Sequence, residues 1–306
     1  MVGAYGGYGG YGGYGGYGGY GGYGGYGNAG GAGGSAFFPD RIDLPFASEP
    51  GIDCLKLNAT GFGDRLWSTR WFSWVVMSDL ACKGDWLDRL GGYELLGEGK
   101  TPWDDCLDED LKCLRTMAIE ERADALAEFV SEADEFIGKF LHLMSATALT
   151  HPATARMLIV ADALTALITM HYKHYFNRPR PTQVVPGFMS PIQHGGHASF
   201  PSGHSTQAHV FAALLTKVVP SSLGDPASTT EAPKRTTIGK ALGVLAHRIA
   251  RNREIAGLHY PSDSRAGVVL AKAITDEILL DPTYLPKFKD LVDDATDEWA
   301  NGGAYA

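Results

Sequence analysis

Apolar residues recur at three- to four-residue spacing through most of the chain, and this periodicity constrains the fold more than any other feature. In the stretch DRLWSTRWFSWVVMSDLA they fall at positions 67, 71, 72, 75 and 76, and a similar spacing runs from Ala123 to Leu149. A helix of 3.6 residues per turn places such side chains on one face, whereas a half-buried strand would alternate apolar and polar residues. Both stretches are therefore predicted to be helical and to face the core.

A third helix is predicted to begin near Pro152 and to end before the sequence NRPRP at 177–181. Thr150 is the expected N-cap of this helix, and proline suits a first helical turn. The later stretches 203–219, 236–256, 262–280 and 284–299 are also helix-like, and strand patterns are scarce. We therefore predict an all-α fold, with one domain over residues 37–306.

Residues 5–27 form a strict YGG repeat, which sets a low-complexity tail at 1–36 apart from the globular domain. Two glycines in every three residues make ordering entropically costly, and the prolines of a collagen repeat are missing. We therefore expect a disordered, Gly/Tyr-rich tail that is either a solvated linker or a segment for self-association into a homo-oligomer. The second option keeps open a self-assembling structural protein with a vestigial enzyme fold.

The formal net charge of −9 argues against nucleic acid as a partner, because the overall field of the protein would repel it. The chain has no uncharged apolar run of about 18 residues, and its best stretch, 157–170, is interrupted by Asp162. We therefore expect a soluble chain with no transmembrane segment. The N-terminus lacks a basic start followed by an apolar core, so no signal peptide is expected and a cytoplasmic location is favoured.

The cysteine and histidine patterns do not indicate a metal site. The cysteines at 54, 82, 106 and 113 form no zinc-like CxxC pair, and their even number permits disulfides without requiring them. His194, His197 and His204 lie close together in sequence, but no cysteine partner, HEXXH sequence or nearby carboxylate accompanies them. No metal is therefore expected, and His194 and His197 are expected to line an entrance or to support other residues.

Two short sequences, KHYFNRPRP and FPSGHS, place polar residues at helix ends. In the first, Lys173 lies near the end of the third predicted helix, and Arg180 follows seven residues later in a proline-stiffened loop. In the second, Ser202 and Gly203 open a predicted helix, where backbone N–H groups and the helix dipole favour an anion. Taken singly, the basic residues could simply complement a helix C-terminus, and the serine could be an ordinary cap.

A third sequence, RNREIAGLHYPSDSRAG, contains Arg253, His259 and Asp263. A carboxylate four residues after a histidine can orient the imidazole through a hydrogen bond to its second ring nitrogen. The arginine six residues before the histidine suits bidentate binding of an anion. A surface ion pair would explain Arg253 and Asp263 equally well.

Together, in this order and on a helical background, the three sequences resemble the superfamily that joins the type 2 phosphatidic acid phosphatases, the bacterial class A non-specific acid phosphatases and the vanadium-dependent haloperoxidases. The resemblance covers about residues 115–280 and is carried by Lys173, Arg180, Pro181, Pro201, Ser202, Gly203, His204, Arg253, His259 and Asp263. One departure is Asn252, where the family often has serine, and it puts one accessory hydrogen bond in doubt. The resemblance implies a helical bundle of the acid phosphatase/vanadium haloperoxidase type, with the site at one end.

The resemblance also implies a phosphate- or vanadate-binding site built from three cations and two fixed donors. The cations are Lys173, Arg180 and Arg253, and the donors are the Ser202 hydroxyl and the Gly203 backbone N–H. Phosphoryl transfer needs such groups, because negative charge spreads over the equatorial oxygens in the transition state.

Three further residues would carry the chemistry. His259, held by Asp263, would be the nucleophile that forms a phosphohistidine. His204 would protonate the leaving oxygen and would then activate water. On this account the enzyme needs no metal and no other cofactor.

With these roles, the expected function is that of a metal-independent, acid-phosphatase-like phosphomonoesterase that acts on soluble phosphate esters. The alternative is a vanadium-dependent haloperoxidase, which oxidises halide with hydrogen peroxide and holds vanadate as cofactor, with His259 as the axial ligand. His197 favours this alternative, because some bromo- and iodoperoxidases have histidine at that place. The short globular part and the sequences RPRP and HYPSDSRAG favour the phosphatase, and the motifs themselves do not separate the two activities.

Overall fold

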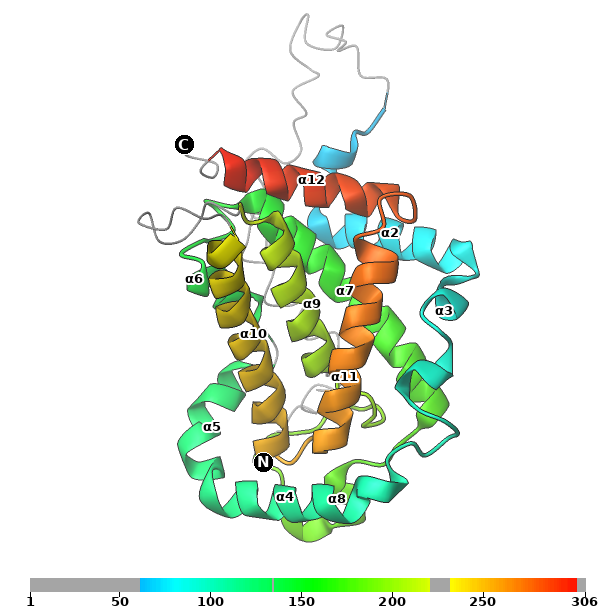
Figure 1. The fold of residues 1–306 in the computed structure, drawn as a ribbon, viewed down its shortest axis with the longest axis vertical. Helices are drawn as coiled ribbons and strands as arrows, with labels where there is room; N and C mark the ends of the chain where they lie inside the picture. The colour runs from blue at the N-terminus through cyan, green and yellow to red at the C-terminus, as the bar shows by residue number, and fades with distance from the viewer. Residues whose placement is uncertain (1–60, 134, 221–231, 302–306) are drawn as a thin grey trace, which may run out of the picture.

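The computed structural model describes residues 61–133, 135–220 and 232–301, and this part of the chain is helical and contains no strand (Figure 1). The predicted all-α fold is therefore confirmed for these residues. The YGG repeat, its predicted self-association and the domain boundary at residue 37 lie outside the described residues. Cys82, Cys106 and Cys113 are free thiols, and Cys54 lies outside the described part.

Long helices form the body of the fold, and short helical pieces connect them. The longer helices are α2 (Thr69–Lys83), α4 (Leu107–Glu120), α7 (Pro152–Phe176), α9 (Gly203–Val218), α10 (Ala232–Ile255), α11 (Pro261–Ala273) and α12 (Pro286–Ala300). The shorter pieces are η3 (Asp64–Leu66), α3 (Trp86–Arg89), η4 (Tyr93–Leu96), η5 (Asp104–Cys106), α5 (Arg122–Ser131), α6 (Ile137–Leu143), α8 (Pro181–Val184), η6 (Pro186–Phe188) and the π-helical η7 (Ile274–Leu279).

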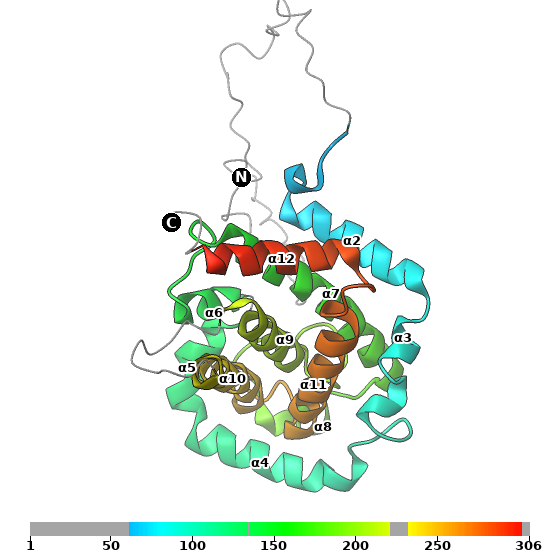
Figure 2. The same ribbon diagram turned by 45° about the horizontal axis from the view of Figure 1, so that its top comes forward.

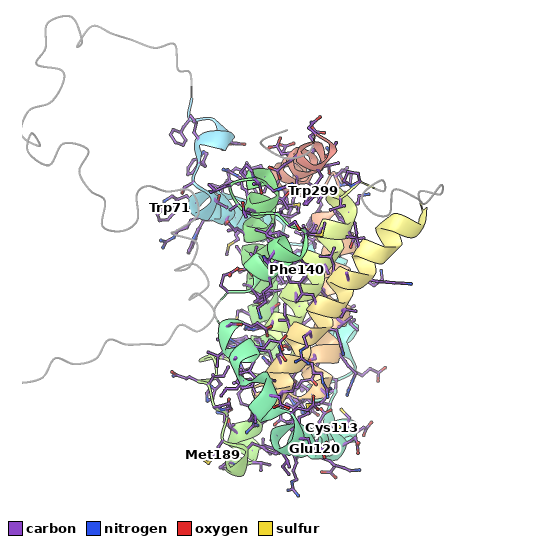
Figure 3. The ribbon with its side chains drawn as sticks, turned by 90° about the vertical axis from the view of Figure 1, so that its left-hand side faces the viewer. Trp71, Cys113, Glu120, Phe140, Met189 and Trp299 are labelled. Atoms are coloured by element: carbon purple, nitrogen blue, oxygen red, sulfur yellow. The ribbon has the colours of Figure 1, made fainter. Side chains whose placement is uncertain are left out.

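Helix α9 lies at the centre of the bundle and packs against α7, α10 and α11 (Figure 1). Helices α2 and α12 lie at one end, and α4 and α8 lie at the other (Figures 1 and 2). From the side, Trp299 marks the first end, and Glu120 and Met189 mark the second (Figure 3). Each fully buried apolar side chain contributes about 1.5–3 kcal/mol to folding. The fully buried residues of the centre include Leu158, Leu164, Ile168 and Phe211.

The N-terminus of α7 is capped by a residue of α12, and the prediction that Thr150 caps it is wrong. The backbone N–H groups of Ala153 and Thr154 donate to the carboxylate of Glu298 at 2.8 and 2.9 Å. The Thr150 hydroxyl instead accepts from the backbone N–H of Thr147 at 2.9 Å. A carboxylate is a stronger acceptor than a hydroxyl at the positive end of a helix dipole, so the distant glutamate replaces the local cap.

The periodic stretch from residue 123 to 149 forms two helices, α5 and α6, with a break between them. The apolar spacing continues across the break, with Phe129 and Phe136 buried on either side, so periodicity alone does not reveal it. Glu132 lies in the break, is 0% exposed and accepts from Lys139 Nζ at 2.7 Å. The break therefore places a buried carboxylate inside the bundle.

One helical segment, Pro152–Val184, is long and apolar enough by length and composition to cross a membrane, with a mean hydropathy of 1.5 over its apolar window. The expectation that the chain has no transmembrane segment is therefore wrong. That expectation required an unbroken uncharged run, whereas the single charge of Asp162 leaves the mean hydropathy of the window high. Within the fold, 67% of this window is buried.

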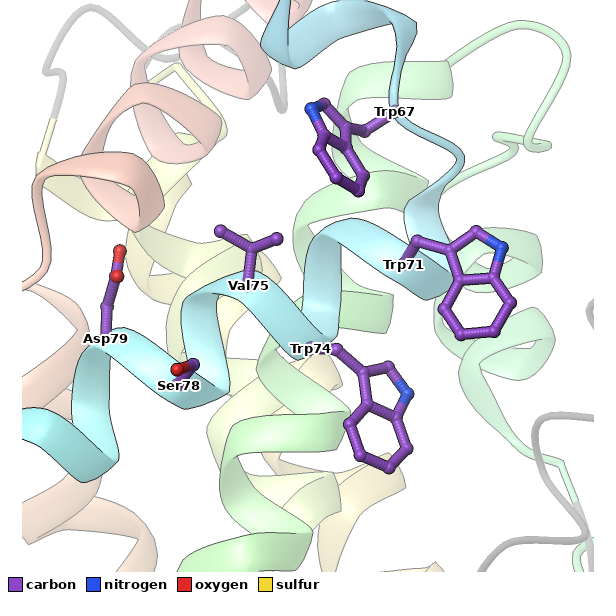
Figure 4. A pocket seen from close by; sticks show the side chains of 6 residues that line it. All are labelled: Trp67, Trp71, Trp74, Val75, Ser78 and Asp79. Carbon is purple, nitrogen blue, oxygen red and sulfur yellow. The ribbon is translucent and has the colours of Figure 1, made fainter.

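An open surface groove of about 360 Å³ lies along α2 (Figure 4). Its lining residues are Trp67, Trp71, Trp74, Val75, Ser78 and Asp79. Trp71 and Trp74 project away from the helix, and each is 55% exposed. No motif residue lines this groove, so it is not the predicted site.

Candidate active site

Loops and helix ends bring the three motif sequences together on the side of the bundle where α4 and α8 lie (Figure 1). Lys173 lies in the last turn of α7, Arg180 precedes α8, and Ser202 and Gly203 begin α9. The third sequence runs from the end of α10 through a short loop into α11. The backbone N–H of Ser202 donates to the Asp263 carbonyl at 3.0 Å, which joins the second and third sequences directly.

His259 lies in the loop before α11, is 3% exposed and has a partner at each ring nitrogen. Nδ1 is 3.0 Å from Oδ2 of Asp263, and Nε2 is 3.0 Å from a terminal guanidinium nitrogen of Arg180. A guanidinium only donates, so Nε2 accepts, and the ring proton is assigned to Nδ1, which donates to Asp263. Burial, followed by the charge of Arg180, lowers the pKa of His259 well below its usual value. The imidazole is therefore neutral, with its lone pair on Nε2.

Asp263, in the first turn of α11, is fully buried and accepts hydrogen bonds on both carboxylate oxygens. Oδ2 also accepts from the Ser199 hydroxyl at 2.5 Å and from the Tyr260 N–H at 3.1 Å, and Oδ1 accepts from Arg178 at 2.6 Å. Burial acts to raise the pKa of Asp263, but the hydrogen bond with His259 and the charge of Arg178 lower it well below its usual value. The carboxylate therefore stays ionised and holds the Nδ1 proton of His259.

Lys173 is 1% exposed, and its ammonium donates to the backbone carbonyls of Ala198 at 2.8 Å and Ser199 at 2.7 Å. An ammonium has three donors, so these contacts leave one N–H for a further acceptor. Burial, followed by the charge of Arg180, lowers the pKa of Lys173 well below its usual value, although Asp263 acts in the opposite direction. A bound anion would raise this pKa again, because an opposite charge favours the protonated form.

Arg180 is 3% exposed and contacts two histidines. Its Nε donates to the His197 carbonyl at 3.1 Å, and the terminal nitrogen next to His259 also donates to the Leu258 carbonyl at 2.8 Å. Its other terminal nitrogen is 3.1 Å from Nδ1 of His197. Burial lowers the pKa of Arg180 to about 10, which leaves it charged at neutral pH. Burial, followed by the charges of Lys173 and Arg180, lowers the pKa of His197 to about 3, so this ring is neutral.

Arg253, near the end of α10, pairs with Glu132 at the break between α5 and α6. One terminal nitrogen of Arg253 is 3.4 Å from the Glu132 carboxylate and also donates to the Phe129 carbonyl. The same carboxylate oxygen accepts from Asn252 Nδ2 at 2.9 Å. At position 252 the sequence departs from the expected serine, and here the asparagine amide holds the carboxylate that pairs with Arg253.

The start of α9 offers donors to an anion. Ser202 is the N-cap and accepts from the Ser205 N–H at 3.4 Å, so its hydroxyl proton remains available to donate. A Cβ at Gly203 would make only an ordinary van der Waals contact, 3.8 Å from Gln207 Oε1, so the backbone here is not crowded. An anion can therefore approach the first N–H groups of α9, where the helix dipole favours it.

His204 lies in the first turn of α9, half-buried and stacked on Phe136 with ring centroids 5.2 Å apart. Nε2 is 3.1 Å from the Glu132 carbonyl, which only accepts, so the neutral ring is assigned its proton on Nε2 and its lone pair on Nδ1. Burial, followed by the charge of Arg253, lowers the pKa of His204 to about 3. A phosphate group beside Arg253 would offset that charge and raise the pKa, as a general acid requires.

The structure thus brings the predicted binding and catalytic residues to one place, and it brings His197 to their edge. His194 is exposed, and its Nδ1 lies 3.0 Å from the Gly195 carbonyl, outside the network that joins the other residues. Among the described residues, no group of three His, Cys, Asp or Glu side chains could hold a metal ion. The catalytic roles of the converging residues remain predictions.

Sequence reasoning missed four buried residues that contact the predicted site. Arg178 and Ser199 lie within three positions of motif residues, so a closer reading of KHYFNRPRP and of the residues before FPSGHS could have found them. Glu132 and Asp110 lie far ahead of Lys173 and belong to no recognisable motif. Only the folded chain could show that these two carboxylates support the site.

Comparison with protein families matches residues 154–283 to the PAP2 superfamily. The resemblance to this superfamily that the motifs predicted is therefore confirmed for residues 154–283. The matched PAP2 segment contains every site residue predicted above, from Lys173 to Asp263, whereas Asp110 and Glu132 lie before it. PAP2 members are phosphatases, so the prediction of a phosphatase-type hydrolase is supported at the level of the superfamily.

No curated protein matches this chain. Among solved structures, a transmembrane PAP2 type phosphatidylglycerolphosphate phosphatase from Bacillus subtilis matches at 18% identity with a TM-score of 0.31. The match covers 70% of this chain and 93% of that chain. Similarity this low does not transfer the substrate of that PAP2 protein to this one.

Proposed function

We propose that this chain is a metal-independent phosphomonoesterase that works through a phosphohistidine at His259. The observation that carries the proposal is the neutral His259 ring, which donates from Nδ1 to ionised Asp263 and presents Nε2 beside Arg180. Such a ring is a nucleophile held in one tautomer by a carboxylate.

Buried cations favour a phosphate group as the substrate moiety. Lys173 and Arg180 are almost fully buried, and their hydrogen-bond partners in the described chain are backbone carbonyls and imidazole nitrogens. Burying a positive charge is costly unless an opposite charge compensates it, and a phosphate dianion supplies that charge. Arg253, the Ser202 hydroxyl and the Gly203 N–H would complete the set of donors to the equatorial oxygens.

In the first step, the Nε2 lone pair attacks phosphorus, a P–N bond forms and the bond from phosphorus to the ester oxygen breaks. The phosphate oxygens take over the hydrogen bond that Arg180 donates to Nε2, which frees the lone pair. Asp263 stabilises the positive charge that the ring acquires, because its Oδ2 already holds the Nδ1 proton. His204, protonated on Nδ1 once phosphate is bound, gives that proton to the leaving oxygen.

In the second step, neutral His204 takes a proton from a water molecule as that water attacks phosphorus. The P–N bond breaks, inorganic phosphate forms, and His259 regains its neutral ring with the proton on Nδ1. The same nitrogen of His204 thus serves as acid and then as base, because Nε2 stays bonded to the Glu132 carbonyl. We propose soluble phosphate monoesters as the substrates.

Phosphate release from p-nitrophenyl phosphate tests the proposal. We expect turnover in the wild type, and a loss of about 10⁴-fold or more in kcat for His259→Ala, because no other group replaces the nucleophile. His209→Ala is the matched control, since His209 lies in the same helix as His204 and its Nδ1 contacts only a backbone carbonyl in the described chain. Wild-type turnover in folded His259→Ala would overturn the role of His259.

A vanadium-dependent haloperoxidase is the second candidate. The cations and donors that fit phosphate also fit vanadate, which has the same shape, and His197 lies 3.1 Å from Arg180 at the edge of this set. Lys173, Arg180, Arg253 and His259 would hold the vanadate, which would supply peroxide activation for halide oxidation. The test is bromination of monochlorodimedone with hydrogen peroxide after vanadate loading. Bromination without any phosphate release from esters would replace the phosphatase proposal with this one.

A further inference from the structure

Arg178 contacts Asp263, the partner of His259, and is 1% exposed. It lies in the sequence KHYFNRPRP but is not one of the residues that carry the family resemblance. Its guanidinium carbon lies 3.7 Å from the ring centroid of Tyr260 and 4.7 Å from that of Trp103. One terminal nitrogen donates to Oδ1 of Asp263 at 2.6 Å and to the Ser262 hydroxyl at 2.7 Å. The side chain is therefore fixed by two aromatic rings and directed at the oxygen of Asp263 that does not contact His259.

A second carboxylate holds the other side of this guanidinium. Oδ2 of Asp110, in α4, lies 3.6 Å from the second terminal nitrogen of Arg178 and also accepts from the Ser262 hydroxyl. Asp110 is 2% exposed and lies outside the segment that matches the PAP2 superfamily. The buried groups therefore follow one another as Asp110, Arg178, Asp263 and His259.

The arrangement is costly to build for stability alone. Replacing a buried ion pair by apolar residues of similar volume is often neutral or stabilising, so burial of three charges indicates a role beyond packing. Nε and the second terminal nitrogen of Arg178 make no hydrogen bond within the described residues, which adds to that cost. What the arrangement does achieve is a fixed carboxylate plane at Asp263, because Arg178 binds Oδ1 and so directs Oδ2 at Nδ1 of His259.

We propose that Arg178, held by Asp110, is a positioning residue that orients Asp263 and so fixes the tautomer of His259. The inference rests on the proposed function, because it assigns Arg178 an effect on the nucleophile of that reaction. Lys173, Arg180 and Arg253 still bind the phosphate when Arg178 is removed, so kcat falls while KM changes little. The effect resembles that of other residues that orient a catalytic ligand, about 10- to 100-fold.

The decisive experiment is chemical rescue of Arg178→Ala. We expect kcat for p-nitrophenyl phosphate to fall by about 10- to 100-fold and to recover when guanidinium is added at a non-denaturing concentration, because the ion can enter the space between Trp103 and Tyr260. Arg178→Lys should recover part of the loss without added ion. Arg156→Ala is the matched control, since Arg156 also contacts an aromatic ring and two backbone carbonyls, but near α2. It should keep wild-type kcat and show no response to guanidinium.

Asp110→Asn serves if Arg178→Ala does not fold, because it removes one charge and keeps the size of the side chain. We expect a shift of its pH–rate profile and, in ¹⁵N NMR, a mixed tautomer at His259 where the wild type has the proton on Nδ1. Wild-type kcat, pH profile and NMR signals in Asp110→Asn, or no response of Arg178→Ala to guanidinium, would overturn the inference. Absence of phosphate release by the wild type would instead refute the proposed function, and the NMR comparison would still test the positioning role.

Discussion

At the scale of single residues, the site is defined by protonation states that burial and neighbouring charges impose. Lys173, His204 and His259 all have a lowered pKa, with burial as the first cause, whereas Asp263 stays ionised because His259 and Arg178 contact it. The lowered values describe the chain without a bound anion. Binding of a phosphate dianion should therefore be accompanied by proton uptake.

Lys173→Met is expected to stabilise the chain and to remove its response to phosphate. In phosphate-free buffer the free energy of unfolding should rise by about 1 kcal/mol, because a buried cation bonded to carbonyls is replaced by an apolar side chain of similar length. Thermal unfolding checks this, and the expected rise in Tm is about 2–4 °C. Phosphate should raise the Tm of the wild type but not that of the variant.

Lys272→Met is the control for this prediction, because Lys272, at the end of α11, is exposed and pairs with Asp276 of η7. It should change neither the Tm nor the phosphate response by a measurable amount. A lower Tm for Lys173→Met together with an unchanged phosphate response would show that Lys173 is a structural residue.

The pKa of His204 predicts how stability depends on pH. Its pKa is lowered to about 3, from an ordinary value of 6.5. Between these values the unfolded chain binds a proton that the folded chain does not, so the free energy of unfolding falls as pH drops from about 7 towards 3. Urea unfolding at several pH values should show a shallower fall for His204→Asn than for the wild type. Identical pH dependence in the two proteins would contradict the lowered pKa.

At the scale of elements, helix ends are held by residues from other helices. The first turn of α7 is bonded by Glu298 of α12, which accepts from the N–H groups of Ala153 and Thr154 and from the Thr154 hydroxyl at 2.6 Å. The α7 helix also carries Lys173 at its far end. The contact between α12 and α7 therefore supports the helix that carries Lys173, a proposed phosphate ligand.

Glu298→Ala is expected to lower the free energy of unfolding by about 1–2 kcal/mol, since it removes a charged cap from a buried helix start. Chemical denaturation measures the change. Asp297→Ala is the control, because Asp297 is its exposed neighbour in the same helix. Equal effects of the two substitutions would show that Glu298 acts only through the negative charge it adds to α12, and not as a cap of α7.

At the scale of the whole molecule, Glu132 connects the break between α5 and α6 with the site. Its carboxylate contacts Lys139, Asn252 and Arg253, and its backbone carbonyl accepts from His204. One buried residue therefore contacts both Arg253, a proposed phosphate ligand, and His204, the proposed general acid. The geometry of the site depends in this way on helices that precede the PAP2 segment.

Glu132→Gln is expected to lower the free energy of unfolding by about 3 kcal/mol, because it removes the charge that compensates buried Arg253. Glu128→Gln is the matched control in α5, since Glu128 pairs with Arg248 of α10 at 2.6 Å and both side chains are partly exposed. That exposed pair should contribute less than about 1 kcal/mol. Comparable losses for the two variants in urea unfolding would contradict the structural role of Glu132.

Much of the fold and the composition of the site follow from local sequence. Apolar periodicity predicts the helices that carry the core, and the order of Lys173, Arg180, the PSGH sequence, Arg253 and His259 predicts which residues meet. Local sequence features also led to three errors. They predicted the wrong N-cap for α7, did not show the break at Glu132, and gave no transmembrane segment, although Pro152–Val184 is long and apolar enough to be one.

Only the tertiary structure decided what holds these residues in place. The contacts of Glu298 with Ala153, of Asp110 with Ser262 and of Glu132 with Asn252 join positions 145, 152 and 120 residues apart. The assigned His259 tautomer also depends on Arg180, which approaches from another loop. Periodicity and motifs are properties of a short window of sequence. A buried polar contact depends on which surfaces the packing of the bundle brings together. Local sequence therefore identifies the candidate site residues, and the packed fold sets their partners and protonation.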